Sequence, residues 1–331
     1  MSERPFLAVE NLVKYFPIFT RGVFLKKQVG LIHAVDGISF SVKKGTTFGL
    51  VGESGCGKTS TARAILYLDP PTSGSIYLED KKVGEIFKSK NRAEKLKLRR
   101  KMQYVFQNPY ASLDPRMTVA DIIMEPLMIH KHVPKNKWHD KLYELLELVG
   151  LEDYHAERYP HEFSGGQRQR VCIARALAVE PQLLIADEPV ASLDVSVRAQ
   201  ILNLLQELQQ KLRITYLYIS HDLSTVRHIC HKVAVMYLGQ FVEIAETDKL
   251  FSSPQHPYTQ ALLSSIPIPD PETKRSRIIL PGEVPSPINP PAGCRFRPRC
   301  THSKDHSCGK NAQKLIDVGN GHLVACERVH E

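Results

Sequence analysis

The stretch at residues 52–60, GESGCGKTS, constrains the fold of this chain more than any other part of its sequence. It matches the pattern G-x-x-x-x-G-K-[ST], with Gly52, Gly57, Lys58 and Thr59 at the fixed positions. The preceding TFGLV is typical of a short buried strand, and the residues that follow are typical of a helix start. In this context glycines let backbone N–H groups converge on phosphate oxygens, and the helix N-terminus adds partial positive charge. The sequence therefore predicts a site for a nucleoside triphosphate.

We call residues 52–60 the phosphate loop. Taken alone, its glycines could also form a simple turn or a dinucleotide-binding loop, but the Lys58-Thr59 pair favours a triphosphate. Lys58 is expected to reach the β- and γ-phosphates, and the Thr59 hydroxyl is expected to bind Mg²⁺. The predicted nucleotide contacts in the loop are Gly52, Glu53, Ser54, Gly55, Cys56, Gly57, Lys58, Thr59 and Ser60.

Two carboxylates follow a second apolar stretch, LLIA at residues 183–186. Such a run predicts a strand of a parallel sheet that is covered on both faces, and ligands of open α/β sheets bind beyond the carboxyl ends of strands. We expect Asp187 to hold Mg²⁺, and we expect Glu188 to orient or deprotonate the attacking water.

A second glycine-rich segment, residues 164–167 (SGGQ), opens another predicted helix. Ser164 can cap that helix, while Gly165 and Gly166 expose backbone donors to an anion. Because the segment is distinct from the phosphate loop, the chain carries two phosphate-facing motifs. This arrangement indicates composite sites shared between two such domains, with Ser164, Gly165, Gly166 and Gln167 as nucleotide contacts.

The composition is that of a globular protein, with 42% hydrophobic and 24% charged residues in a chain of 331. No run approaches the ~20 apolar residues of a membrane span, and the N-terminus lacks the pattern of a secretory signal. A cytosolic protein is therefore expected. The net charge of +9 permits nucleic acid or an anionic membrane as a partner. The densest basic run, residues 88–101, has no aromatic residues between its charges and is interpreted as a solvated face.

The pattern of strands and helices predicts an α/β fold with a mixed core sheet. A helical subdomain is predicted at about residues 95–178, inserted into a nucleotide-binding domain of residues 5–253. Residues 17–30 are interpreted as a surface loop. From residue 254 prolines and cysteines accumulate, which predicts a small irregular C-terminal extension at residues 254–331.

The motifs and their order resemble those of the ATP-binding cassette (ABC) ATPases, over about residues 5 to 250. In this resemblance Gln107 corresponds to the glutamine that joins the core to the helical subdomain, and residues 192–194 correspond to the D-loop. His221 corresponds to the switch histidine, and Phe16, with Tyr15 as the second choice, to the aromatic residue that stacks on adenine. The implied catalytic residues are Glu188, His221, Gln107 and Lys58, and the implied Mg²⁺ ligands are Thr59, Gln107 and Asp187.

Further segments resemble the ATP-binding subunits of dipeptide/oligopeptide importers: NPYASLDP at residues 108–115, HPYTQALL at residues 256–263 and the proline-rich extension. This resemblance implies a peripheral subunit at the cytoplasmic face of the cell membrane. Its implied partners are two transmembrane permease subunits, a second and different ABC ATPase subunit, and indirectly an extracytoplasmic peptide-binding protein. No nucleic acid is expected. Uptake of another small solute such as nickel, or a non-transport ABC ATPase that acts on nucleic acid, remains the alternative.

Four of the seven cysteines lie in the extension: Cys294, Cys300, Cys308 and Cys326. Four thiolates suit a structural zinc or an iron–sulfur cluster equally in ligand number. Three arginines around the first pair, at positions 295, 297 and 299, are expected to favour the thiolate form. The importer resemblance implies a [4Fe–4S] cluster, with zinc as the second choice and free structural cysteines as the third.

Overall fold

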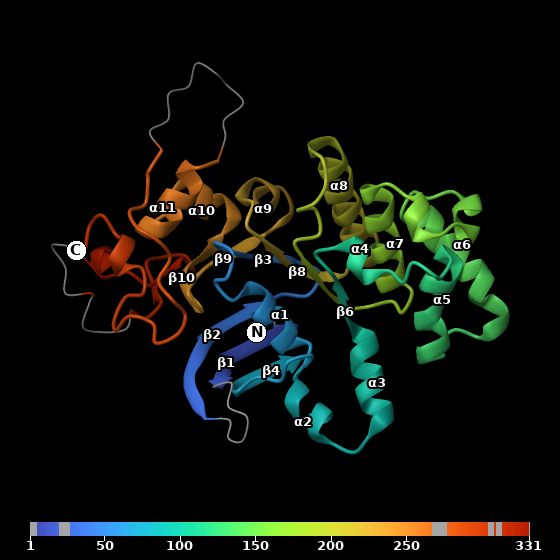
Figure 1. Cartoon of the computed structure of the whole chain (residues 1–331), viewed down its shortest axis with the longest axis horizontal. Helices are drawn as coiled ribbons and strands as arrows, with labels where there is room; N and C mark the ends of the chain where they lie inside the picture. The colour runs from blue at the N-terminus through green and yellow to red at the C-terminus, as the bar shows by residue number, and fades with distance from the viewer. Residues whose placement is uncertain (1–4, 20–26, 267–276, 304–307, 309–312, 331) are drawn as a thin grey trace. The chain divides into compact units, whose positions relative to one another are not determined.

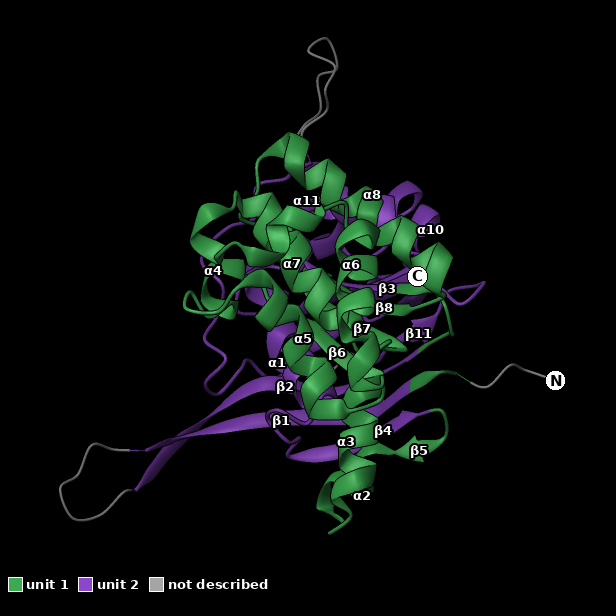
Figure 2. Ribbon diagram, turned by 90° about the vertical axis from the view of Figure 1, so that its right-hand side faces the viewer, with its two compact units in different colours: residues 1–7, 42–47, 79–219 green, residues 8–41, 48–78, 220–331 purple. Residues whose placement is uncertain are grey.

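The computed structural model describes residues 5–19, 27–266, 277–303, 308 and 313–330. These residues form an α/β structure with two compact units, each assembled from separate parts of the chain (Figure 2). Unit 1 comprises residues 1–7, 42–47 and 79–219, and unit 2 comprises residues 8–41, 48–78 and 220–331.

Unit 1 contains three parallel strands in the order β8-β7-β6. They are β6 (Met102–Val105), β7 (Leu183–Asp187) and β8 (Thr215–Ser220). Every residue of β7 and β8 is buried, as is expected for strands covered on both faces of a parallel sheet. The strand predicted at residues 183–186 is confirmed by β7.

The helices of unit 1 form its larger part, and α5, α6 and α7 pack against one another (Figure 1). Leu142, Leu145 and Leu146 are buried and form the apolar face of α6. The helices are α2 (Val83–Lys88), α3 (Arg92–Lys101), α4 (Pro109–Ser112), α5 (Val119–His130), α6 (Trp138–Leu148), α7 (Gly165–Leu177) and α8 (Val195–Leu212). Short 3₁₀ turns lie at η1 (Lys135–Lys137), η2 (Asp153–Glu157) and η3 (Pro160–Glu162), and the two-residue strand β5 is Lys81–Lys82.

Unit 2 contains strands in the order β11-β12-β10-β9-β3. The parallel pair β3–β9 and the antiparallel pair β9–β10 make its sheet mixed, as predicted. The strands are β3 (Thr47–Val51), β9 (Lys232–Tyr237), β10 (Gln240–Glu246), β11 (Ile316–Asp317) and β12 (Leu323–Val324). The last two come from the C-terminal extension, which is therefore not wholly irregular.

A second sheet of unit 2 contains β2, β1 and β4 in that order. Its strands are β1 (Leu7–Phe19), β2 (Gln28–Val42) and β4 (Ser73–Leu78). The surface loop predicted at residues 17–30 is wrong at both ends, because β1 continues to Phe19 and β2 begins at Gln28. The last residues of β1 and the first residues of β2 are partly exposed on both faces. They therefore lack the alternation of apolar and polar residues that identifies a strand.

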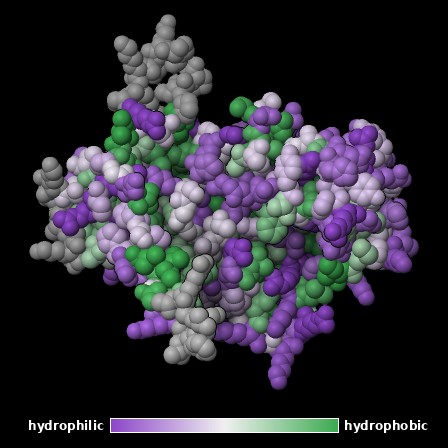
Figure 3. All heavy atoms as spheres, viewed as in Figure 1, coloured by the Kyte–Doolittle hydropathy of each residue, from purple (hydrophilic) through white to green (hydrophobic). Residues whose placement is uncertain are grey.

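The helices of unit 2 are α1 (Lys58–Ile65), α9 (Leu223–Ile229), α10 (Thr247–Ser252) and α11 (Pro257–Ser264), with 3₁₀ turns at η4 (Arg297–Arg299) and η5 (Glu327–His330). Helices α10 and α11 contact β10. None of the described helices has both the length and the apolar character needed to cross a membrane. On the face drawn in Figure 3, hydrophobic residues lie in small groups among hydrophilic ones.

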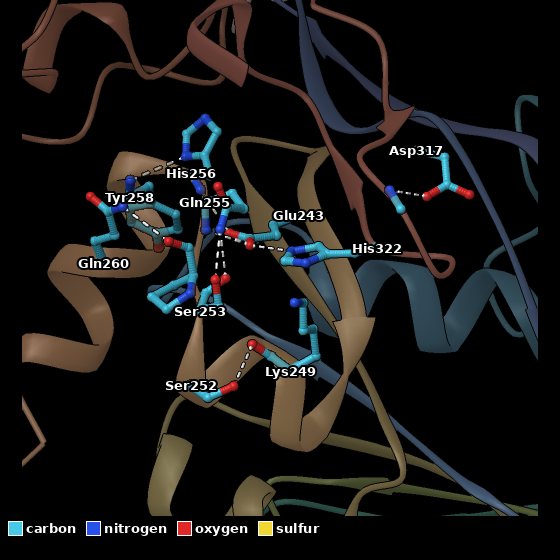
Figure 4. A network of polar contacts seen from close by, with 12 residues as sticks. Glu243, Lys249, Ser252, Ser253, Gln255, His256, Tyr258, Gln260, Asp317 and His322 are labelled. Carbon is cyan, nitrogen blue, oxygen red and sulfur yellow. Dashed lines mark hydrogen bonds and ion pairs between the residues drawn. The ribbon is translucent and has the colours of Figure 1, made fainter. Parts of the chain in front are cut away.

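The buried carboxylate of Glu243 connects β10, α11 and β12 (Figure 4). Its oxygens accept hydrogen bonds from the backbone N–H groups of Gln255 and His256, at 2.8 and 3.0 Å. Nε2 of His322, which immediately precedes β12, lies 2.6 Å from Oε1 of Glu243. One side chain thus fixes the start of α11 and the returning end of the chain to the same strand.

Candidate nucleotide-binding site

The phosphate loop in unit 2 has a backbone that only glycine can adopt at two positions. Gly52 has φ +155° and Gly57 has φ +111°. A Cβ atom on Gly57 would lie 2.0 Å from the carbonyl oxygen of Ala34, and one on Gly52 would lie 2.2 Å from that of Met236. The loop is therefore packed directly against β2 and β9, and α1 begins at its Lys58.

Lys58 is folded back over the loop and only 5% exposed. Its Nζ donates to the carbonyl oxygens of Gly52 and Glu53, at 2.8 and 3.0 Å. A cation held at this point can offset phosphate charge without reorganising. The hydroxyl-bearing Thr59 is exposed, whereas the Cys56 side chain is buried and its pKa is raised by burial. Burial therefore favours the thiol form of Cys56 over the thiolate.

The two predicted adenine-stacking residues are neighbours on β1, so their rings point to opposite faces of the strand. The Tyr15 ring centroid lies 4.2 Å from that of His33, and its hydroxyl donates to Asp36. Burial, together with this hydrogen bond to Asp36, raises the pKa of Tyr15 to about 12. The Phe16 ring has the Lys14 ammonium 4.8 Å from its centroid. Contacts within the protein thus hold the Tyr15 ring in place. The stacking of Phe16, the first choice, on adenine stays a prediction.

The two carboxylates of unit 1 lie at the end of β7 in different surroundings. Asp187 is 2% exposed and accepts a hydrogen bond of 2.5 Å from the Tyr104 hydroxyl. Glu188 has φ +47°, an uncommon value for a side-chain-bearing residue, and accepts a 2.8 Å hydrogen bond from Nε2 of Gln107. The structure therefore brings together Gln107 and Glu188, which lie 81 residues apart in the chain.

Sequence reasoning missed Tyr104. The available signal was its place three residues before Gln107. In the structure β6 pairs with β7, and Tyr104 is in register with Ile185. The missing information was the pairing itself, which joins segments far apart in the chain.

The segment 164–167 in unit 1 begins α7 with Ser164 as the cap, as predicted, and the structure adds a capping box with Gln167. The Gln167 N–H donates to Oγ of Ser164 at 3.3 Å, and the Ser164 N–H donates to Oε1 of Gln167 at 3.0 Å. A Cβ atom on Gly166 would lie 2.3 Å from Cγ1 of Val197, so this glycine also permits close packing against α8. Ser164 itself is exposed and accessible to a partner.

His221 follows the end of β8 and is exposed. The next residue, Asp222, caps α9 by accepting a 2.9 Å hydrogen bond from the Ser224 N–H. The predicted nucleotide residues thus fall into two groups. Unit 2 carries Tyr15, Phe16, the phosphate loop and His221, and unit 1 carries Gln107, residues 164–167, Asp187 and Glu188.

The four cysteines of the extension line one cavity in unit 2, which we call the cysteine cavity. Its volume is about 20 Å³, room for about one water molecule. Burial raises the pKa of Cys294 to about 11, and burial also raises the pKa of Cys308 and of Cys326. Within the described ranges, no group of three or more His, Cys, Asp or Glu side chains is arranged to hold a metal ion.

We expected three neighbouring arginines to stabilise thiolates, and this expectation is wrong for two of the arginines. Arg299 binds Glu53, and Arg295 binds Asp36 and the carbonyl oxygen of Leu238, so both guanidinium groups are engaged elsewhere. The sequence places these arginines beside cysteines but carries no sign of where their side chains point.

Comparisons with known proteins agree with this geometry. Residues 35–191 match the ABC transporter family, and residues 242–308 match the C-terminal region of oligopeptide/dipeptide transporters. The chain is 48% identical to the oligopeptide transport ATP-binding protein AppF of Bacillus subtilis (strain 168), over 98% of both chains. It is 47% identical to the dipeptide transport ATP-binding protein DppF of Escherichia coli (strain K12), over 99% of this chain and 96% of that protein.

Among solved structures, the chain is similar to the post-hydrolysis dimer of the ATP-binding cassette MJ0796 bound to ADP and Pi. The TM-score is 0.62 at 27% identity, over 73% of this chain and 98% of that chain. It is also similar to cbiO1 from Clostridium perfringens, part of the ABC transporter complex cbiONQ, with a TM-score of 0.62 at 27% identity over 76% and 92% of the two chains.

Proposed function

The chain belongs to the ABC transporter family and, within it, to the ATP-binding proteins of oligopeptide and dipeptide transporters, and from this membership we propose that it is the ATP-hydrolysing subunit of a membrane importer of di- and oligopeptides. The observation that carries the proposal is the phosphate loop, in which glycine-only backbone surrounds a buried lysine at the start of a helix. Such a loop binds the phosphates of a nucleoside triphosphate.

In the proposed reaction, water attacks the γ-phosphorus of ATP and ADP leaves. Lys58 and the N–H groups of the loop offset the charge of the transferred phosphoryl group. Glu188, held by Gln107 at 2.8 Å, orients the water or accepts its proton. His221 donates a hydrogen bond to the γ-phosphate. Thr59, Asp187 and Gln107 would hold Mg²⁺, which would neutralise charge on the phosphates.

A second ABC ATPase subunit would complete each site, with the phosphate loop of one subunit facing residues 164–167 of the other. We favour a different subunit over a second copy. Two permease subunits would receive the opening and closing motion at the cytoplasmic face of the membrane, and an extracytoplasmic binding protein would supply the peptide. The proposed limits are residues 5–253 for the ABC domain, with the helical subdomain at about 95–178, and residues 254–331 for the extension.

The test is the variant Glu188→Gln, which keeps the partner of Gln107 but cannot accept a proton. We expect ATP binding to be retained and ATP hydrolysis by the assembled transporter to fall by about two orders of magnitude. Turnover is measured by phosphate release and binding by a fluorescent ATP analogue. Glu157→Gln, at an exposed carboxylate of unit 1, is the control. Hydrolysis by Glu188→Gln at the wild-type rate would rule out the assigned base.

The cysteine cavity is the proposed site of a [4Fe–4S] cluster, with zinc as the alternative. Four thiols around one cavity support a metal in ligand number, whereas a volume of about 20 Å³ suits a single ion better than a cluster. Protein purified without oxygen is analysed for iron, sulfide and zinc, with the four-serine variant as control. A colourless protein without either metal would contradict both assignments.

A further inference from the structure

The turn at residues 294–300, which we call the tail turn, carries two buried arginines beside the phosphate loop within unit 2. Arg295 and Arg299 are each 8% exposed, although arginine is rarely buried without a partner. The third arginine of the turn, Arg297, is exposed. The turn is closed by its own backbone, since the Cys300 N–H donates to the carbonyl of Arg297 at 3.2 Å.

Arg299 forms a two-pronged ion pair with Glu53 of the phosphate loop. Its Nη1 lies 2.7 Å from Oε2 of Glu53, and its Nη2 lies 3.3 Å from Oε1. Parallel contacts of this kind fix direction as well as charge. The backbone N–H of Glu53 is held too, because it donates to the Tyr258 hydroxyl at 2.9 Å. The backbone N–H and the carboxylate of Glu53 are thus both held by the C-terminal extension. Their partners, Tyr258 and Arg299, lie 205 and 246 positions further along the chain.

Arg295 binds two residues that lie outside the phosphate loop. Its guanidinium donates to the Leu238 carbonyl and to the carboxylate of Asp36, and that carboxylate also accepts from Tyr15. Burial raises the pKa of Asp36, but the contacts with Tyr15 and Arg295 outweigh burial and lower it. The tail turn therefore contacts the loop through Arg299, and through Arg295 it contacts Asp36, the acceptor of the Tyr15 hydroxyl.

Glu53 places a negative charge inside a loop that we assign to a polyanion. An unpaired carboxylate at this position would oppose the phosphates, and Arg299 is the cation that pairs with it. The pair lies on the wall of an open cavity of about 400 Å³, so solvent and salt can reach it.

We propose that Arg299 is a positioning residue for ATP: by pairing with Glu53, it removes the opposing charge from the phosphate loop and holds the loop ready for the nucleotide. This inference rests on the proposed ATP site at residues 52–60. It makes the extension part of the nucleotide site, although no residue of the extension need touch ATP.

The experiment measures the Kd of a fluorescent ATP analogue for the full chain. We expect Arg299→Met to weaken binding by about tenfold, the order expected for one uncompensated charge in a partly buried site. Adding Glu53→Gln to Arg299→Met should restore binding to within about twofold, because the opposing charge is then gone. Arg297→Met, at the exposed arginine of the same turn, is the matched control.

Two results would overturn the inference: wild-type affinity in Arg299→Met, or a double variant that stays as weak as the single one, since a merely structural arginine is not rescued at Glu53. Should Arg299→Met fail to fold, Arg299→Lys decides, because it keeps a cation beside Glu53. The inference expects a Kd within about threefold of wild type, and a Kd about tenfold weaker refutes it. Lys58→Ala separates this inference from the proposed site. If Lys58→Ala binds as well as wild type, the ATP site itself is misplaced.

Discussion

At the scale of single residues, backbone geometry and burial determine what each functional group can do. Gly52 and Gly57 are required by space as well as by φ, because each approaches a carbonyl oxygen that a Cβ atom would displace. The motif in the sequence predicted these glycines as phosphate contacts. It could not predict that β2 and β9 are the elements against which they pack.

Gly57→Ala should therefore impair both stability and nucleotide binding. Its φ of +111° and a Cβ only 2.0 Å from the Ala34 oxygen predict a loss of about 2 kcal/mol or more in unfolding free energy. Gly55→Ala is the matched control, because Gly55 has φ +80° with nothing within 4 Å of its Cβ. Urea unfolding measures the free energy of unfolding of the two variants. Equal losses in the two variants would mean that the close approach to Ala34 does not matter.

His256 predicts a pH dependence of stability. Burial lowers its pKa from 6.5 to about 3, and its neutral Nδ1 accepts a 3.1 Å hydrogen bond from the Tyr258 N–H. Below pH 6.5 the unfolded chain binds a proton at this position and the folded chain does not, so stability falls as the pH decreases toward 3. This residue alone should remove about 2 kcal/mol between pH 7.5 and pH 5.

The check compares urea midpoints at these two pH values for wild type and His256→Asn, whose side chain can still cap α11. The variant should lose less stability on acidification than wild type. An unchanged pH dependence would contradict the role of His256. His139→Asn, at an exposed histidine of α6, controls for the exchange itself.

At the scale of elements, the sequence predicted β7, because its residues form a continuous apolar run that is buried in the sheet. It predicted a loop where β1 ends and β2 begins, because these partly exposed segments lack a pattern. It also missed β11 and β12. Strands of two residues have no period, and they exist only because β10 offers an edge.

Glu243 is the residue whose loss should most disturb this edge. Glu243→Ala removes the acceptor of two backbone N–H groups and leaves His322 without its buried partner (Figure 4). Breaking a buried pair in this way costs on the order of 3 kcal/mol or more. Thermal unfolding of Glu243→Ala is compared with that of Glu246→Ala, at the exposed end of the same strand. A Tm within a degree of wild type would show that the network is dispensable.

At the scale of the whole molecule, the chain carries two groups of nucleotide residues, and a complete site is proposed to need a second subunit. The sequence motifs predicted this division of roles because the two glycine-rich segments differ. They could not predict the contribution of Tyr258 or Arg299, since no motif links the extension to the phosphate loop.

Ser164→Arg tests the proposed interface between two ABC ATPase subunits. Ser164 is exposed at the start of α7, so a large cation there should leave the fold intact and obstruct a facing nucleotide. We expect the variant to bind ATP on its own loop with unchanged Kd, while hydrolysis by the assembled transporter falls at least tenfold. Ser164→Ala, which keeps the site open, should lose much less. Full hydrolysis in Ser164→Arg would mean that no nucleotide lies across this surface.

The tail turn has a practical consequence for anyone who trims this protein. A fragment cut after residue 253 would retain every recognisable nucleotide motif, yet it would lack the hydroxyl and the two guanidinium groups that reach back to Glu53 and Asp36. Rates and affinities measured on such a fragment would describe a phosphate loop without these contacts, not the loop of the intact subunit.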